Sequence, residues 1–253
     1  MDRCLGGICC AESWLRKLPL PHGRGTETTA QEQWHALALV AEVFMAERIG
    51  LYGGSFNPIH HGHLILARAV GEQLNLQRVI FLPSVRPPHK DPSDDADAVH
   101  RAEMVRLAIS GEALFEFSDF DLTRPGPTYT IDTVFHFRTV YGADVELYWL
   151  IGADSLNDLA TWHRIKELVN TCRIVTAARP GVGTFEWKRL VAKIGQEHVS
   201  RLRSGILATP EIAISSSEIR LRVQRGESIH ELVPPHVEEY IQEHGLYGLP
   251  GVS

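Results

Sequence analysis

The segment Gly53–His63, with the sequence GGSFNPIHHGH, combines glycines and histidines in a pattern that suits chemistry on a phosphate group. Gly53 and Gly54 allow backbone conformations and close approaches that other residues exclude. A loop that leads into a helix presents free N–H groups and the positive end of the helix dipole, which favour phosphate. His60 and His63 are three residues apart, so both imidazoles could face one site, donate hydrogen bonds and, near neutral pH, carry charge that stabilises a transferring phosphoryl group.

Simpler explanations account for parts of this segment. Two glycines can make a turn, and histidines can stand at the start of a helix, but we favour a functional role for the complete string. A metal site is the weaker interpretation of the histidines, because no cysteine or acidic residue stands beside them at zinc spacing. The segment lacks the G-x-G-x-x-G fingerprint of dinucleotide-binding folds, and the chain has no G-x-x-x-x-G-K-[ST] phosphate loop.

A second polar segment, residues 214–220 with the sequence ISSSEIR, also suits a phosphate. Ser215 and Glu218 have the spacing of a helix capping box, which is the purely structural interpretation. Three consecutive hydroxyls exceed what a cap needs, and Arg220 lies three residues after Ser217 on the same helix face. Hydroxyls, free N–H groups and a guanidinium together predict binding of a triphosphate.

Several single residues are further candidates, each with a structural alternative. Lys90, beside a proline turn, could meet a phosphate as a point charge, although most loop lysines are merely solvated. Gly152 permits a close approach and Asp154 could accept a hydrogen bond from a ribose hydroxyl, or both could belong to a capped turn. Thr130 opens a helix, where threonine is a good cap. Trp162 is typical of a core, yet its indole could stack on a pyridine ring.

The elements that must position these residues alternate between strands and helices. This alternation predicts an α/β fold, a parallel sheet with helices on both faces, in which ligands sit outside the carboxyl ends of the strands. The predicted strands are Ile49–Tyr52, Val79–Leu82, Leu114–Phe117, Leu147–Ile151, Ile174–Ala177 and Ile206–Ile214. The predicted helices are Gly62–Leu74, Ala98–Ile109, Thr130–Tyr141, Ser216–Arg225 and Pro235–His244.

Composition narrows the class of protein. The chain has 253 residues and a formal net charge of −6, which does not favour binding to nucleic acid or to a membrane surface. Its four cysteines, Cys4, Cys9, Cys10 and Cys172, form no disulfide framework, so we expect a cytoplasmic protein. The most apolar N-terminal stretch, Ala36–Ala46, is too short to span a bilayer and contains a glutamate. We expect residues 1–47 to be a poorly ordered or partly helical extension and residues 48–253 to be the folded domain.

Taken together, these strings resemble the bacterial nicotinate-nucleotide adenylyltransferases, which belong to the nucleotidyltransferase superfamily with an H-x-G-H motif, here residues 60–63. That motif alone also occurs in phosphopantetheine adenylyltransferases, cytidylyltransferases and class I aminoacyl-tRNA synthetases. The resemblance covers almost all of residues 48–247 and leaves residues 1–47 without a counterpart. The matching strings are Gly53–His63, Pro87–Lys90, Tyr129–Thr133, Ile151–Leu156, Trp162–His163, Ala178–Pro180, Ile214–Arg220 and Val233–Tyr247.

The resemblance implies a single Rossmann-like nucleotidyltransferase domain. It implies adenylyl transfer from ATP to nicotinate mononucleotide, giving nicotinate adenine dinucleotide and pyrophosphate in NAD biosynthesis, with phosphate-bound Mg²⁺ as cofactor. We expect no metal ligand from the protein. The implied catalytic residues are His60, His63 and Arg220; those that bind ATP are Gly53, Gly54, Ser55, Phe56, Gly152, Asp154, Ser216 and Ser217; those that bind the acceptor are Lys90, Thr130 and Trp162.

Rival interpretations change the acceptor or remove the turnover. Nicotinamide mononucleotide differs from the nicotinate form only by an amide in place of a carboxylate, and phosphopantetheine is a second alternative acceptor. A nucleotide-binding regulator without turnover is the rival from another class; the presence of His60, His63 and Arg220 argues against it. A homo-oligomer is compatible with the sequence, which does not determine the assembly.

Overall fold

A computed structural model describes residues 46–85, 96–178, 185–210 and 213–248 of the protein. The chain from Ala46 onward is assigned to one compact unit. The predicted extension lies outside the described residues except for its last two, and it stays a prediction. Within the described ranges, no helix has both the length and the apolar character needed to cross a membrane.

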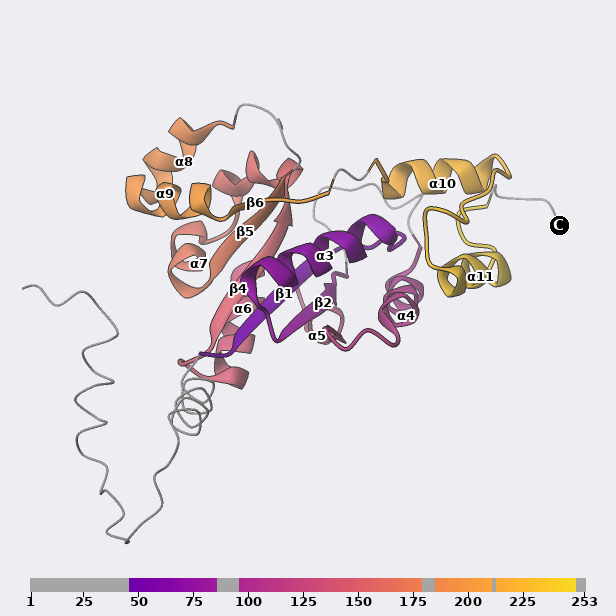
Figure 1. Ribbon diagram of the computed structural model, residues 1–253, viewed down its shortest axis with the longest axis horizontal. Coiled ribbons are helices and arrows are strands. Elements are labelled where there is room, and N and C mark those ends of the chain that lie inside the picture. Colours follow the sequence, from indigo (N-terminus) through magenta and orange to yellow (C-terminus); the bar gives the residue numbers. More distant parts are fainter. Residues whose placement is uncertain (1–45, 86–95, 179–184, 211–212, 249–253) are drawn as a thin grey trace, which may run out of the picture. The chain divides into compact units, whose positions relative to one another are not determined.

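The centre of the fold is a parallel six-stranded sheet with the order β3-β2-β1-β4-β5-β6 (Figure 1). The order runs one way from β1 to β3 and the other way from β4 to β6, so the reversal falls between β1 and β4. In sheets of this kind, ligands bind at that reversal, beyond the carboxyl ends of the strands. The strands are β1 Arg48–Gly54, β2 Arg78–Pro83, β3 Phe115–Phe117, β4 Glu146–Gly152, β5 Arg173–Ala178 and β6 Ile206–Ala208.

The last predicted strand was too long. β6 ends at Ala208, whereas the sequence predicted a strand as far as Ile214. The Thr209 N–H still donates to the Ala178 carbonyl at 3.2 Å, but Ala178 is the last residue of β5. Pro210 has no N–H to donate, and the partner strand has ended, so the ladder stops there.

Helices cover both faces of the sheet, as the sequence predicted. The five predicted helices are confirmed within one or two residues, and the structure adds short helices that the sequence did not predict. The helices are α3 His61–Leu74, α4 Ala98–Ile109, α5 Phe120–Thr123, α6 Thr130–Tyr141, α7 Ile165–Thr171, α8 Trp187–Ile194, α9 Gln196–Ser204, α10 Ser216–Gln224 and α11 Pro235–Glu243, with 3₁₀ turns η2 Ala153–Leu156 and η3 Leu159–Thr161.

Alternating strand residues fill two apolar cores, one on each face. Leu51 and Trp149 belong to the core covered by α6, α7, α8 and α9. Tyr52 and Leu150, their neighbours in sequence, belong to the core covered by α3, α4, α10 and α11. This alternation follows from the two-residue period of a strand. Both faces of the sheet are therefore covered. A ligand can reach the sheet at its carboxyl edge, where the loops after β1 and β4 emerge.

Candidate active site

Residues 53–59, at the end of β1 and directly after it, form a tightly packed segment that we call the glycine loop. A Cβ on Gly53 would lie 2.6 Å from the Trp149 ring, so a larger residue there would displace that ring. Phe56 has a φ of 46° and is 1% exposed, and its ring packs on Tyr52 and Phe81. Because this side chain is in the core, any contact between Phe56 and ATP would come from its main chain.

The two histidines of the H-x-G-H motif lie together at the start of α3. His60 precedes the first residue of the helix, and His63 is the third residue within it. Their rings stack with centroids 3.8 Å apart. The His63 Nδ1 atom accepts a hydrogen bond from the His60 backbone N–H at 3.2 Å. An accepting Nδ1 places the proton of a neutral imidazole on Nε2, so His63 presents an Nε2–H donor.

Both imidazoles are held in the neutral form. Burial, and secondarily the nearby His61, lowers the pKa of His60 to about 4. Burial also holds the pKa of His63 well below its usual value, with His60 as a smaller cause. The expectation of charged imidazoles near neutral pH is therefore wrong. A desolvated cation is unfavourable, so burial keeps both rings neutral at pH 7.

One atom of this pair is poorly satisfied. The His63 backbone N–H approaches the His60 side chain in a capping-box arrangement, but among the described residues the buried His60 Nδ1 makes no hydrogen bond of normal geometry, although the residue is only 6% exposed. A buried polar atom left in this state is unfavourable by about 1–3 kcal/mol. A ligand that offers a hydrogen-bonding atom would remove that penalty.

The serine-rich start of α10 packs against the same loop. Ser215 caps the helix by accepting the Glu218 N–H at 3.2 Å, which confirms the capping interaction. The Ser216 hydroxyl donates to the Pro58 carbonyl at 3.0 Å. The Arg220 Nη1 donates to the Asn57 carbonyl at 2.8 Å, and its Nη2 donates to the Ser217 hydroxyl at 3.4 Å. Two motifs that are far apart in the sequence thus form one polar site.

The end of β4 has room for a ligand beside it. Gly152 closes the strand, and a Cβ built on it would have no atom of the described residues within 4 Å. Asp154 follows in η2 with an exposed side chain. Because β4 pairs directly with β1, both residues emerge at the same sheet edge as the glycine loop. This placement is compatible with their predicted contact to ATP, which stays a prediction.

The predicted acceptor residues lie in a second group at the start of α6. Tyr129 occupies the N-cap position and Thr130 is the first helical residue, so threonine does not cap this helix. The Tyr129 ring stacks on the His163 ring at 4.2 Å, which brings the chain at Thr130 beside the chain at Trp162. Trp162 is half-buried and packs against the core under α6 to α9. Lys90 lies outside the described residues.

Arg101 also belongs to this region, although no sequence motif marked it as a site residue. It is 4% exposed, and its guanidinium donates to the carbonyls of Ser55 at 2.5 Å and of Ala96 at 3.1 Å. Two further bonds, at 2.8 Å, reach Ser84 and Val85 after β2. The arginine thus joins the glycine loop to the loop after β2. The sequence did contain a signal, because Arg101 stands on the apolar face of α4 with buried neighbours three, four and seven positions later.

Replacing Arg101 with methionine should destabilise the protein by about 3 kcal/mol or more, because several carbonyls would lose a donor in a dry environment. Urea unfolding measures this change. The matched control is Arg106→Met, since Arg106 lies on the same helix with its side chain 47% exposed. A loss below about 1 kcal/mol in Arg101→Met, or an equal loss in both variants, would contradict the stabilising role of the Arg101 hydrogen bonds.

Comparison with known proteins gives consistent matches. A model of the family described as "Cytidylyltransferase-like" matches residues 51–222. The chain is 43% identical over 201 residues to a probable nicotinate-nucleotide adenylyltransferase of Moorella thermoacetica, covering 79% of this chain and 91% of that protein. It is 42% identical over 200 residues to the probable enzyme of the same description from Thermomicrobium roseum, with the same coverage of 79% and 91%.

Solved structures support the fold. The chain is similar to the Plasmodium falciparum nicotinic acid mononucleotide adenylyltransferase complexed with NaAD, with a TM-score of 0.64 and 19% identity over 79% of this chain and 97% of that chain. The same Plasmodium falciparum enzyme complexed with APC gives a TM-score of 0.63 at 18% identity, again over 79% and 97%. At this identity the likeness concerns the fold, and it confirms the predicted Rossmann-like parallel sheet.

Proposed function

The chain belongs to the nicotinate-nucleotide adenylyltransferase family, and from this membership we propose that it transfers the adenylyl group of ATP to nicotinate mononucleotide. The products are nicotinate adenine dinucleotide and pyrophosphate, so the enzyme acts in NAD biosynthesis. One structural observation carries the proposal for the site: the paired imidazoles and the serine–arginine start of α10 meet at the carboxyl edge of the sheet, where the strand order reverses.

The reaction needs an in-line displacement at phosphorus. A phosphate oxygen of nicotinate mononucleotide attacks the α-phosphorus of ATP, a new P–O bond forms, and the bond to the bridging oxygen of the β-phosphate breaks. Pyrophosphate leaves with that electron pair. A phosphate monoester is mostly dianionic at pH 7, since its second pKa is about 6, so the attack requires no general base. The protein therefore acts by positioning the reactants and by stabilising charge.

We assign the charge stabilisation to His60 and His63. The Nε2–H of His63 is a donor whose direction is set by the bond that its Nδ1 accepts. A donor fixed in this way, in a buried site, stabilises charge on the transferring phosphoryl oxygens without reorganising during the reaction. A neutral imidazole keeps one N–H, so each ring can donate a hydrogen bond at neutral pH.

We assign the β- and γ-phosphates to the start of α10. This is the N-terminus of the helix, where Ser216, Ser217 and the first backbone N–H groups lie. The positive end of the helix dipole favours an anion there. Arg220 is already oriented by its bond to the Asn57 carbonyl. Gly53, Gly54 and Ser55 would approach the nucleotide through the main chain.

We propose phosphate-bound Mg²⁺ as the cofactor. It keeps several waters and is commonly held by substrate phosphates together with few protein ligands. In the described part of the chain, no three His, Cys, Asp or Glu side chains form a group that could hold a metal ion. We propose that Mg²⁺ arrives with ATP and supplies neutralisation of the phosphate charge.

The acceptor would bind at the start of α6, beside Thr130 and Trp162. Tyr129, in the N-cap position, makes no side-chain cap bond, so the first N–H groups of the helix are not satisfied by that side chain. The positive end of a helix favours a carboxylate over a neutral amide, which supports nicotinate rather than nicotinamide as the acceptor. Asp154 would contact the nucleotide, and Lys90 a phosphate.

The test is pyrophosphate release from ATP and Mg²⁺ with nicotinate mononucleotide, nicotinamide mononucleotide or phosphopantetheine as parallel acceptors. We expect rapid release with the nicotinate form, on the order of 1–10³ turnovers per second. Pyrophosphate release only with another acceptor would support adenylyl transfer but contradict nicotinate mononucleotide as the substrate. A folded protein that shows a thermal shift with ATP and is silent with every acceptor would instead be a nucleotide-binding regulator.

Two further proposals concern the compartment of the protein and its assembly as a homo-oligomer. We propose the cytoplasm, because the spacing of the four cysteines forms no disulfide framework. Analytical ultracentrifugation would decide whether the protein is a homo-oligomer.

A further inference from the structure

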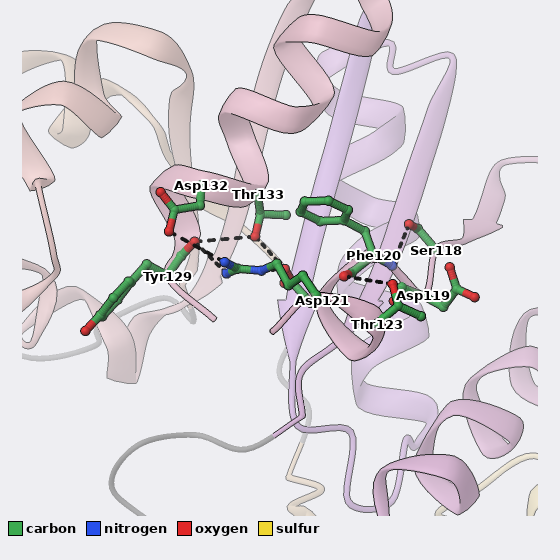
Figure 2. A network of polar contacts seen from close by, with 9 residues as sticks. Ser118, Asp119, Phe120, Asp121, Thr123, Tyr129, Asp132 and Thr133 are labelled. Carbon is green, nitrogen blue, oxygen red and sulfur yellow. Dashed lines mark hydrogen bonds and ion pairs between the residues drawn. The ribbon is translucent and has the colours of Figure 1, made fainter. Parts of the chain in front are cut away.

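A buried polar network joins the short helix α5 to the start of α6 (Figure 2). Asp121 is 4% exposed, and Thr133 is fully buried. Figure 2 shows their side chains facing each other, and the Thr133 hydroxyl donates to Asp121 Oδ1 at 2.7 Å. The Arg124 Nε donates to the same oxygen at 3.1 Å. A buried carboxylate is unfavourable unless it is paired, and here both a hydroxyl and a guanidinium pair it.

The other nitrogens of Arg124 reach the first turn of α6. Nη2 donates to the Tyr129 carbonyl at 3.2 Å, and Nη1 lies 3.5 Å from Asp132 Oδ2. The Arg124 side chain is 15% exposed, so these contacts are largely shielded from water. A planar guanidinium can bind three groups in fixed directions, which an ammonium cannot do. One side chain thus holds α5, the residue before α6 and the first turn of α6 together.

The charges in this network affect how favourably an anion binds at the start of α6. Asp132 stabilises the helix through the dipole, but its carboxylate would repel a second anion nearby. Arg124 approaches one oxygen of Asp132, and Arg164 approaches the other at 3.7 Å. Each guanidinium has a closer acidic partner, Glu167 for Arg164 at 2.6 Å and Asp121 for Arg124 at 3.1 Å. Arg124 differs from Arg164 because it also donates to the Tyr129 carbonyl, directly before α6.

The network is also anchored at both ends. Upstream of α5, the Ser118 N–H donates to the Phe81 carbonyl of β2 at 3.0 Å. At the start of α6, the Tyr129 ring stacks on the ring of His163, which directly follows Trp162 in the sequence. The position of the α6 start relative to the sheet edge therefore depends on the contacts between Asp121, Thr133 and Arg124.

We propose that Asp121 and Arg124 are positioning residues that set the start of α6 for an acceptor carrying a carboxylate, with Arg124 offsetting the Asp132 charge. This inference rests on the proposed function, because it places the acid group of the acceptor at that helix start. A purely structural role would lower stability without changing the preference between a carboxylate and an amide.

The experiment compares Arg124→Gln with Arg138→Gln. Arg138 is the matched control, because it lies at the other end of α6 and donates to the carbonyls of Val145 and Thr171. We expect Arg124→Gln to raise KM for nicotinate mononucleotide about tenfold or more, to change KM for ATP less than about twofold, and to lower the ratio of kcat/KM for nicotinate over nicotinamide about tenfold. Arg138→Gln should lower Tm and leave that ratio unchanged.

Calorimetric binding of each mononucleotide to the wild type and to Arg124→Gln, Arg124→Lys and Asp121→Asn supplies a readout that needs no turnover. The inference predicts that the nicotinate preference of the wild type falls in Arg124→Gln and is partly kept in Arg124→Lys. It predicts that Asp121→Asn weakens nicotinate binding more than nicotinamide binding. An unchanged preference in Arg124→Gln, or a wild type that binds both forms equally, would overturn it. A wild type that prefers nicotinate mononucleotide in calorimetry but releases no pyrophosphate would contradict the proposed function and leave the positioning role supported.

Discussion

Replacement of His63 with asparagine is expected to lower kcat about 10²–10³-fold, while the protein stays folded. The amide oxygen of the new side chain would lie near the position of the imidazole Nδ1 and could still accept the His60 N–H, a bond that is 3.2 Å long in the native protein. The variant would lack the distal Nε2–H donor. The predicted decrease in kcat is the effect expected when one fixed hydrogen-bond donor to a transferring phosphoryl group is removed.

Two further variants separate the donor from the ring. His63→Gln carries an amide that can reach the Nε2 position, so it should recover part of the activity lost in His63→Asn. His61→Ala removes the imidazole between the two motif histidines, and it should keep kcat within a few-fold of the wild type. Steady-state pyrophosphate release with saturating substrates gives kcat, and thermal melting verifies the fold. A His63→Asn enzyme with near-normal kcat would refute the assignment of His63 as a catalytic residue.

Acidification is expected to destabilise the protein through His60, by about 3 kcal/mol between pH 6.5 and pH 4. Burial lowers the pKa of His60 to about 4, while the unfolded chain titrates near the ordinary value of 6.5. Between these two values the unfolded state binds a proton that the folded state excludes. Stability from the neutral ring is therefore complete above pH 6.5 and is lost as the pH falls toward 4. Burial of His63 acts in the same direction.

Urea unfolding at several pH values between 4 and 7.5 measures this linkage. Carboxylates also titrate there, so the decisive quantity is the difference between the wild type and His60→Asn, which carries no titrating ring. Removing one linked proton should reduce the slope of stability against pH by up to about 1.4 kcal/mol per pH unit. His236→Asn, at a side chain that is 71% exposed, should keep the wild-type slope. Equal slopes for the wild type and His60→Asn would mean that His60 titrates alike in both states.

Much of the fold followed from local patterns. The helices α4 and α6, each 12 residues long, have the predicted bounds. The short helices α5, α7, α8 and α9 did not follow in the same way. A helix of this length is stable mainly through the core that it covers, so its formation depends on tertiary contacts. β6 was shorter than predicted because strand length depends on the partner strand as well as on composition.

The chemistry of the site divides in a similar way. By itself, the sequence determined the residue types at the site, the capping interaction of Ser215 and the proximity of His60 to His63, because these depend on spacing along one chain segment. Only the tertiary structure decided the neutral state of the imidazoles, the bond from Arg220 to the Asn57 carbonyl and the burial of Arg101. Ionisation depends on desolvation, and the contacts join segments far apart in the chain, so both arise only when the helices close over the sheet.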